Sequence, residues 1–95
     1  MITGKTSSGF DFSVSEKIGN NYEFVKAFKA ANGKKPEERL YGTVDLVRIV
    51  LGADGEERLC EHLREEDGTV PTERILAEIG EIITFVGEKN AEAKK

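Results

Sequence analysis

The chain has 95 residues, of which 34% are charged, and its formal net charge at pH 7 is −4. A chain of this length forms one domain with a single modest core. Lysine and arginine are scattered among acidic residues, so the chain lacks the basic footprint that binds nucleic-acid phosphates or an anionic membrane surface. No apolar run approaches the roughly 20 residues that span a bilayer.

Two local features bear on the compartment. The segment Met1–Lys5 has no apolar stretch of the kind found in a secretory signal. Cys60 is the single cysteine, so it has no partner in the chain for a disulfide. We therefore expect a cytoplasmic protein.

The N-terminal residues 2–14 predict a small β-hairpin. Phe10, Phe12 and Val14 alternate with polar residues, which is the period-two pattern of a strand with one buried face. The three residues Ser7–Gly9 have the length and the glycine of a common hairpin loop. Since a two-stranded hairpin is not stable alone, we expect its apolar face to pack on helices.

Residues 21–87 predict a helical part with four helices. The first helix covers about residues 21–31, between a capping signal and an Asn-Gly pair that stops it. The second opens at Pro36, carries apolar residues on most sides and stops at Gly52. A glycine inside this helix, Gly42, costs up to about 1 kcal/mol relative to alanine, so Thr43 is an alternative start.

The last two predicted helices have the clearest start and stop signals in the sequence. A capping signal at Asp54 starts the third helix, and the acidic segment 65–68 ends it. Pro71 opens the fourth, in which six apolar residues share one broad face at about 100° per residue. Gly87 closes it, and residues 88–95 are expected to form a flexible tail.

The expected fold is therefore a single domain over residues 1–95 of the mainly α (α+β) class: a four-helix domain with a small N-terminal β-hairpin. The last helix contains one candidate partner-binding surface. Phe85 lies off the main apolar face of that helix, so with its neighbours it could offer an apolar edge to another chain or to a second copy. The alternative is that the same residues simply form the core. The candidate residues are Ile79, Ile82, Ile83, Phe85 and Val86.

No pattern predicts catalysis or a bound cofactor or metal. Gly4-Lys5-Thr6 matches the end of a P-loop, but the first glycine of the motif is missing. Neither Asp-Gly pair completes a calcium loop: the Gly68 pair lacks both the first carboxylate and the bidentate glutamate, and the Gly55 pair has Glu61 in the last position but Val50 in the first. His62 lies two positions from Cys60, so on a helix the two side chains point apart, and no serine or threonine has an apparent histidine partner. We expect a protein that is not an enzyme.

Several segments resemble one protein family. The opening MITGKTSSGFDF, the later Val50-Leu51-Gly52 and His62-Leu63-Arg64, and the turn EDGTVP at residues 66–71 are similar to the small tail assembly chaperones of long-tailed (siphovirus-type) bacteriophages and prophages. In that family an SGF-x-F strand precedes helices, followed by an LG break, an LR-x-EDG-x-VP turn and a last amphipathic helix. This order covers roughly residues 8–85.

The resemblance implies a non-catalytic assembly factor in the cytoplasm of the bacterial host, absent from the mature virion. It would bind the tape measure protein and keep it soluble while tail tube subunits polymerise, with the tail tube protein or a second copy as further partners. An acidic helical protein with an apolar helix face suits such a role. The chain departs from the family in the basic link Gly33–Lys35 and in Gly42.

Three other interpretations stay open. The main alternative is an uncharacterised phage or prophage structural protein, or a small helical interaction protein. A DNA-binding regulator would place Thr72-Glu73-Arg74 in a groove, and one cation beside a carboxylate suits that poorly. An acyl or peptidyl carrier needs a serine at a helix start, which the segment Gly42–Leu46 does not supply.

Overall fold

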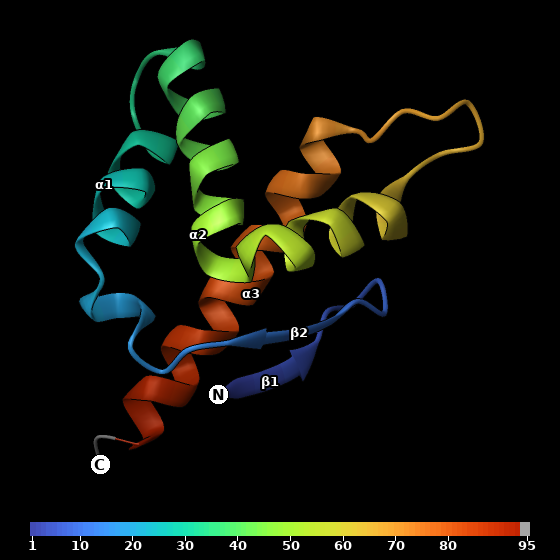
Figure 1. Cartoon of the computed structure of the whole chain (residues 1–95). Coiled ribbons are helices and arrows are strands. Elements are labelled where there is room, and N and C mark those ends of the chain that lie inside the picture. Colours follow the sequence, from blue (N-terminus) through green and yellow to red (C-terminus); the bar gives the residue numbers. More distant parts are fainter. Residues whose placement is uncertain (94–95) are drawn as a thin grey trace.

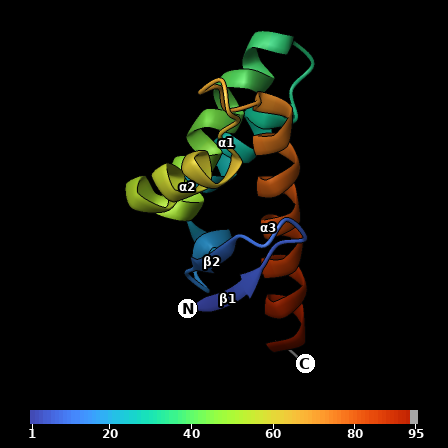
Figure 2. The same cartoon turned by 90° about the vertical axis from the view of Figure 1, so that its right-hand side faces the viewer.

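The computed structural model describes residues 1–93 (Figure 1). The long helix α3 runs along one side of the molecule, and the other elements lie mostly to the other side of it (Figure 2). In chain order the elements are β1 (Ile2–Lys5), β2 (Asp11–Val14), the 3-10 helix η1 (Ile18–Asn20), α1 (Tyr22–Ala31), α2 (Pro36–Leu63) and α3 (Thr72–Ala93).

The predicted N-terminal hairpin is confirmed. Strands β1 and β2 pair antiparallel, with Gly4 opposite Phe12. Gly9 in the loop has φ of 91°, a left-handed conformation that favours glycine because it has no Cβ. Phe10, Phe12 and Val14 are buried, so the alternation in the sequence did identify the face that packs on the helices.

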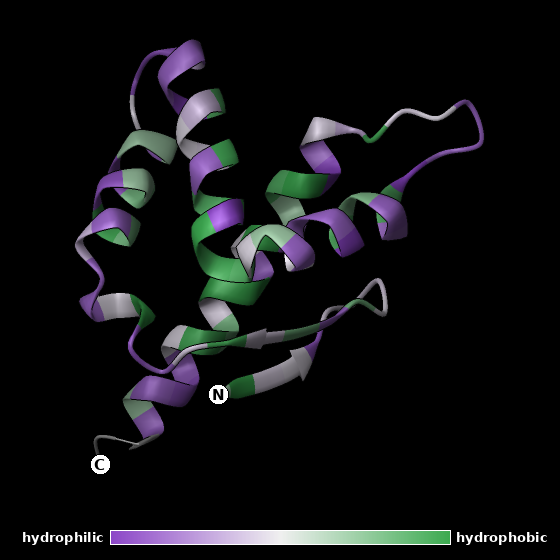
Figure 3. Ribbon diagram, in the orientation of Figure 1, coloured by the Kyte–Doolittle hydropathy of each residue, from purple (hydrophilic) through white to green (hydrophobic). Residues whose placement is uncertain are grey.

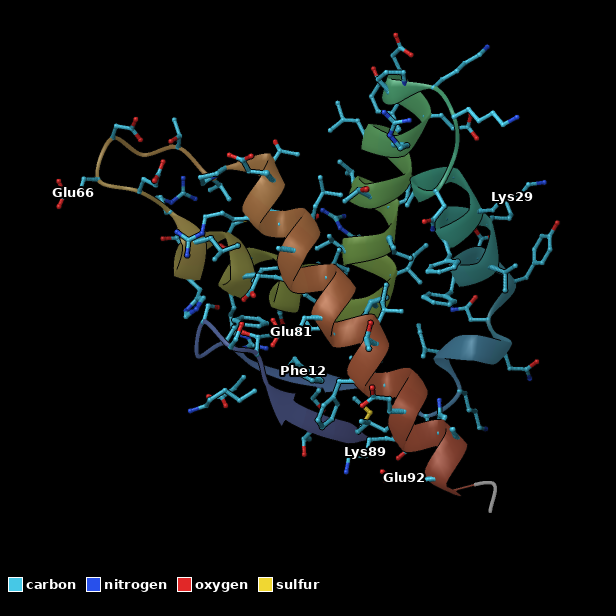
Figure 4. All side chains as sticks on the ribbon, turned by 180° about the vertical axis from the view of Figure 1, so that it is seen from behind. Phe12, Lys29, Glu66, Glu81, Lys89 and Glu92 are labelled. Carbon is cyan, nitrogen blue, oxygen red and sulfur yellow. The ribbon has the colours of Figure 1, made fainter. Side chains whose placement is uncertain are left out.

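The hairpin loop is held to α3 by two carboxylates. Thr6 Oγ1 donates to Glu78 Oε1 at 2.9 Å, and Ser7 N donates to Glu81 Oε1 at 2.7 Å. The side chain of Glu81 reaches from α3 towards the hairpin (Figure 4). Glu78 is only 5% exposed, and hydroxyl donors satisfy it there, as a buried carboxylate requires.

Helix α1 packs closely on the first half of α2. Asn21 caps α1 by accepting a hydrogen bond from Glu23 N at 3.0 Å. The two helices meet at Gly42, where an added Cβ would lie 2.3 Å from Ala31 N. The glycine that looked unfavourable in the sequence is therefore the residue that allows the two backbones to approach. Helix α2 begins at Pro36, the first of the two starts that the sequence allows, and not at Thr43.

The prediction of four helices is wrong: the described residues form three α-helices. The second and third predicted helices are one element, α2, with a kink at Gly52 (φ 76°, ψ 171°). Glycine can take this conformation without a steric penalty, and the helix resumes at the next residue with no loop between the halves. The second half of α2 turns away and runs above the hairpin (Figure 1).

Residues 64–71 connect α2 to α3 as a turn. Gly68 has φ of 90°, and Asp67 accepts hydrogen bonds from Thr69 N and Thr69 Oγ1. These two donors hold the pKa of the Asp67 carboxyl below its usual range, first through the hydroxyl and then through the backbone. The acidic segment ends α2 as the sequence predicted.

Helix α3 is longer than predicted. It does not end at Gly87 but continues to Ala93. Most of the expected tail, residues 88–93, is therefore helical, and residues 94–95 lie outside the described part of the chain. A glycine inside a helix costs only about 1 kcal/mol, and Lys89 with Glu92 adds an i,i+3 ion pair at 3.6 Å just beyond it.

Apolar residues gather where the middle of α2 crosses α3 (Figure 3). Leu59 and Ile82 are completely buried there. No helix within residues 1–93 is long and apolar enough to cross a membrane. The core side chains are Phe10, Phe12, Val14, Ile18, Ala27, Leu46, Val47, Val50, Leu59, Leu63, Ile79, Ile82 and Val86.

Candidate partner-binding groove

The predicted partner surface on α3 is largely part of the core. Ile79, Ile82 and Val86 are buried, and Ile83 and Phe85 are half-buried. The Phe85 ring meets the Phe12 ring of the hairpin edge-on, with centroids 5.4 Å apart. Phe85 lies off the main stripe because the hairpin packs there, so its position does not mark an exposed edge in this structure.

Three of these residues, Ile79, Ile83 and Val86, nevertheless border an open groove between α1 and α3. The groove consists of two hollows of about 200 and 280 Å³ that share Phe28 and Ile83. All lining residues are uncharged. The first hollow is lined by Val14, Ile18, Gly19, Phe24, Phe28, Val50, Ile83, Val86, Gly87 and Asn90. The second is lined by Phe28, Ala31, Asn32, Thr43, Leu46, Leu76, Ile79, Gly80, Ile83 and Thr84.

Aromatic rings from α1 form one wall of this groove, called the α1–α3 groove below. The rings of Phe24 and Phe28 stack with centroids 5.7 Å apart. Phe28 is 43% exposed, and Val25 beside it is also exposed. A large apolar wall of this kind, open to solvent, is typical of a surface that binds another chain.

Helix α3 forms the other wall. Leu76, Gly80, Ile83 and Gly87 line it and follow one another at intervals of four, three and four residues, which is the spacing of a coiled-coil seam. Leu76 is 46% exposed. An added Cβ at Gly80 or at Gly87 would meet no atom within 4 Å, so space remains in front of both glycines.

A third hollow, of about 220 Å³, lies outside the groove, between α2 and the start of α3. Its apolar lining includes Leu40, Val44 and Ile75, and Cys60 opens into it. Burial raises the pKa of the Cys60 thiol, and the nearby Glu56 carboxylate adds to the effect. The Cys60 side chain is half-buried.

The raised pKa of Cys60 predicts that its thiol reacts slowly with alkylating reagents. Alkylation by iodoacetamide at pH 8 should be slower than for a free cysteine, because less thiolate is present. The rate should rise only at higher pH. The folded protein should also lose stability as the pH rises from the usual thiol pKa through the raised one, because the unfolded thiol ionises first. A Cys60→Ser variant has no thiol and gives the background rate of the assay. An alkylation rate at pH 8 equal to that of glutathione would contradict the prediction.

The structure also brings together polar side chains that the sequence did not connect. Ser8 Oγ lies 3.1 Å from His62 Nε2, and it donates to Glu78 Oε1 at 2.5 Å. This hydrogen bond was not predicted from the sequence, in which no serine or threonine has an apparent histidine partner for acyl transfer. The cluster differs from a hydrolytic triad, because the carboxylate binds the serine hydroxyl and does not orient the histidine ring. It joins the hairpin loop to α2 and α3.

Within residues 1–93 no group of three or more histidine, cysteine, aspartate or glutamate side chains could hold a metal ion. No protein-family model, curated protein sequence or solved structure matches the chain. The groove and the sequence motifs are therefore the features that bear on function.

Proposed function

We propose that this protein is a non-catalytic tail assembly chaperone of a long-tailed phage or prophage, acting in the cytoplasm of the bacterial host. It would bind helical segments of the tape measure protein in the α1–α3 groove and keep them soluble during assembly of the tail tube. The observation that carries the proposal is the open groove with uncharged walls. The motif resemblance supplies the identity of the client.

The dimensions of the groove suit a helix. Its α3 wall extends from Leu76 to Asn90, about 15 residues, which corresponds to about 22 Å or four helical turns. The floor is apolar, with Leu46 and Val50 from α2. An amphipathic helix lying there would cover Phe28 and Leu76, the two large side chains on the walls that are most exposed.

Co-expression with the tape measure protein from the same gene cluster tests the proposed function. The wild-type chain should keep the tape measure protein soluble and co-purify with it. The double substitution Phe28→Glu and Leu76→Glu should reduce the soluble fraction at least tenfold, because two carboxylates would be buried without partners. Both positions are partly exposed in the free protein, so the variant should still fold, which circular dichroism checks.

Tyr41→Glu is the matched control. Tyr41 is an exposed aromatic residue on α2 that lines neither hollow of the groove, so this change should leave the soluble fraction unaltered. If the tape measure protein is insoluble with and without the wild-type chain, the proposed client is wrong. A soluble complex with the tail tube protein alone would point to a different assembly role.

A further inference from the structure

One face of α3 carries almost no charge. At 100° per residue, the side of the helix next to the groove and just outside it carries small or apolar residues, most of them exposed. Glu73, in the first turn of α3, falls on this side, whereas Arg74 and the acidic residues from Glu78 onward lie on the remaining surface of the helix. The uncharged positions are Leu76, Ala77, Gly80, Ile83, Thr84, Gly87, Asn90 and Ala91.

The two glycines on this face are not required by the fold. Neither Gly80 nor Gly87 has a positive φ, and neither has an atom within 4 Å of an ideal Cβ. They differ in this from Gly42, whose Cβ would strike the α1 backbone. Seven residues apart on one helix, Gly80 and Gly87 leave two depressions one heptad apart, the geometry that receives apolar side chains of a facing helix.

On the other side of the groove, helix α1 and the link after it are rich in lysine, although the protein as a whole is acidic and no lysine lines either hollow. Between residues 24 and 35 the chain has four lysines and no acidic residue. Lys29 lies on the outer side of α1 (Figure 4), one turn on from Val25. Among the ion pairs of residues 1–93, Lys26 has Glu23 at 4.0 Å, whereas Lys29, Lys34 and Lys35 have no carboxylate within that distance.

We infer that the occupant of the α1–α3 groove is a partner helix that seats heptad-spaced large apolar side chains over Gly80 and Gly87 and directs carboxylates towards Lys29. The charge follows from complementarity: Lys29 on α1 has no carboxylate partner among residues 1–93, and the α3 residues that line the groove are uncharged. The inference rests on the proposed function for the existence of a helical client and specifies what kind of helix is recognised.

Two synthetic peptides test the charge preference. Each has three heptads with leucine at the a and d positions; the flanking e and g positions are all glutamate in one peptide and all lysine in the other. Fluorescence anisotropy in 50 mM NaCl should show the glutamate peptide binding about tenfold more tightly, and high salt should reduce the difference. The net charge of −4 would by itself favour the lysine peptide. A preference for the glutamate peptide would therefore show that the lysines of α1 decide which peptide binds.

The substitution Lys29→Glu should remove or reverse the preference. Equal binding of the two peptides to the wild-type chain, tighter binding of the lysine peptide, or no binding of either would each overturn the inference. Lys17→Glu makes the same charge change at an exposed position outside the groove lining and should leave the preference in place.

The double substitution Gly80→Leu and Gly87→Leu tests the seating. Leucine is a better helix former than glycine, so the melting temperature should not fall. Binding of the glutamate peptide should weaken tenfold or more, because the depressions are filled. Glu88→Leu adds the same side chain to α3 outside the residues that line the groove; because it also removes a carboxylate, it should not weaken binding of the glutamate peptide. If the variant with leucine at both positions binds the glutamate peptide as tightly as the wild-type chain, the partner side chains do not sit over Gly80 and Gly87.

The outcome can be separated from that of the proposed function. If the wild-type chain solubilises the tape measure protein and the glycine variant does so equally well, the recognition described here is wrong while the chaperone role stands. If the glutamate peptide binds with the expected preferences but the tape measure protein stays insoluble, the groove chemistry stands and the client is a different helix.

Discussion

Replacing Gly42 by alanine is expected to lower the free energy of unfolding by about 2 kcal/mol. The new Cβ would lie 2.3 Å from Ala31 N and 2.8 Å from Ala30 Cβ, and the first of these is backbone, which cannot move aside alone. Forcing extra atoms into packed structure costs about 1–3 kcal/mol or more. The gain in helix propensity of up to about 1 kcal/mol recovers only part of that cost, and α1 must move away from α2.

Urea unfolding followed by circular dichroism measures this loss, and Gly80→Ala provides the matched control. Both glycines lie inside helices, but Gly80 has open space where its Cβ would be. The control should therefore gain up to about 1 kcal/mol from propensity alone. A small domain has a total stability of only about 5–15 kcal/mol, so the opposite signs are easily resolved. If Gly42→Ala were as stable as Gly80→Ala, the close approach of α1 and α2 would be wrong.

Glycine also explains what could and could not be predicted from the sequence. A glycine is locally a helix stop, so Gly52 and Gly87 predicted two helix ends. In the structure Gly52 makes a kink with φ of 76° inside α2 and Gly87 lies within α3. The local signal cannot distinguish a stop from a kink or from an exposed helical glycine, because the difference depends on what the following residues pack against. Gly42 shows the same limit: a glycine is needed there because the backbone of α1 packs against it, and that contact is not visible in the sequence around residue 42.

The hairpin and the core face of α3 were predictable because each depends on one local period. The groove was not, because it depends on how far α1 stands from α3 after both have packed on α2. Ile83 and Leu76 belong to the same apolar stripe as Ile79 and Ile82, and the sequence gives them similar weight. A second seam with the spacing 76, 80, 83 and 87 could have been noticed, but its two glycines hide it from a search for apolar residues.

Ile82→Ala and Ile83→Ala should separate the core of α3 from its groove wall. Ile82 is completely buried, so its truncation should lower the free energy of unfolding by about 2–5 kcal/mol through lost transfer energy and a cavity. Ile83 borders both hollows of the groove and is half-buried. Its truncation removes less buried surface and opens onto solvent, so the loss should be about half as large or less.

The same pair should show the reverse order in binding. Under conditions where both variants are folded, Ile83→Ala should weaken capture of the tape measure protein, because a groove wall is lost, whereas Ile82→Ala should leave it nearly unchanged. Urea midpoints and co-purification yields measure the two quantities on the same preparations. Equal destabilisation by both changes would mean that the protein fills the groove with its own side chains, and equal binding would mean that Ile83 does not contact the client. Adjacent residues on one helix thus distinguish the packing that maintains the fold from the surface that it presents.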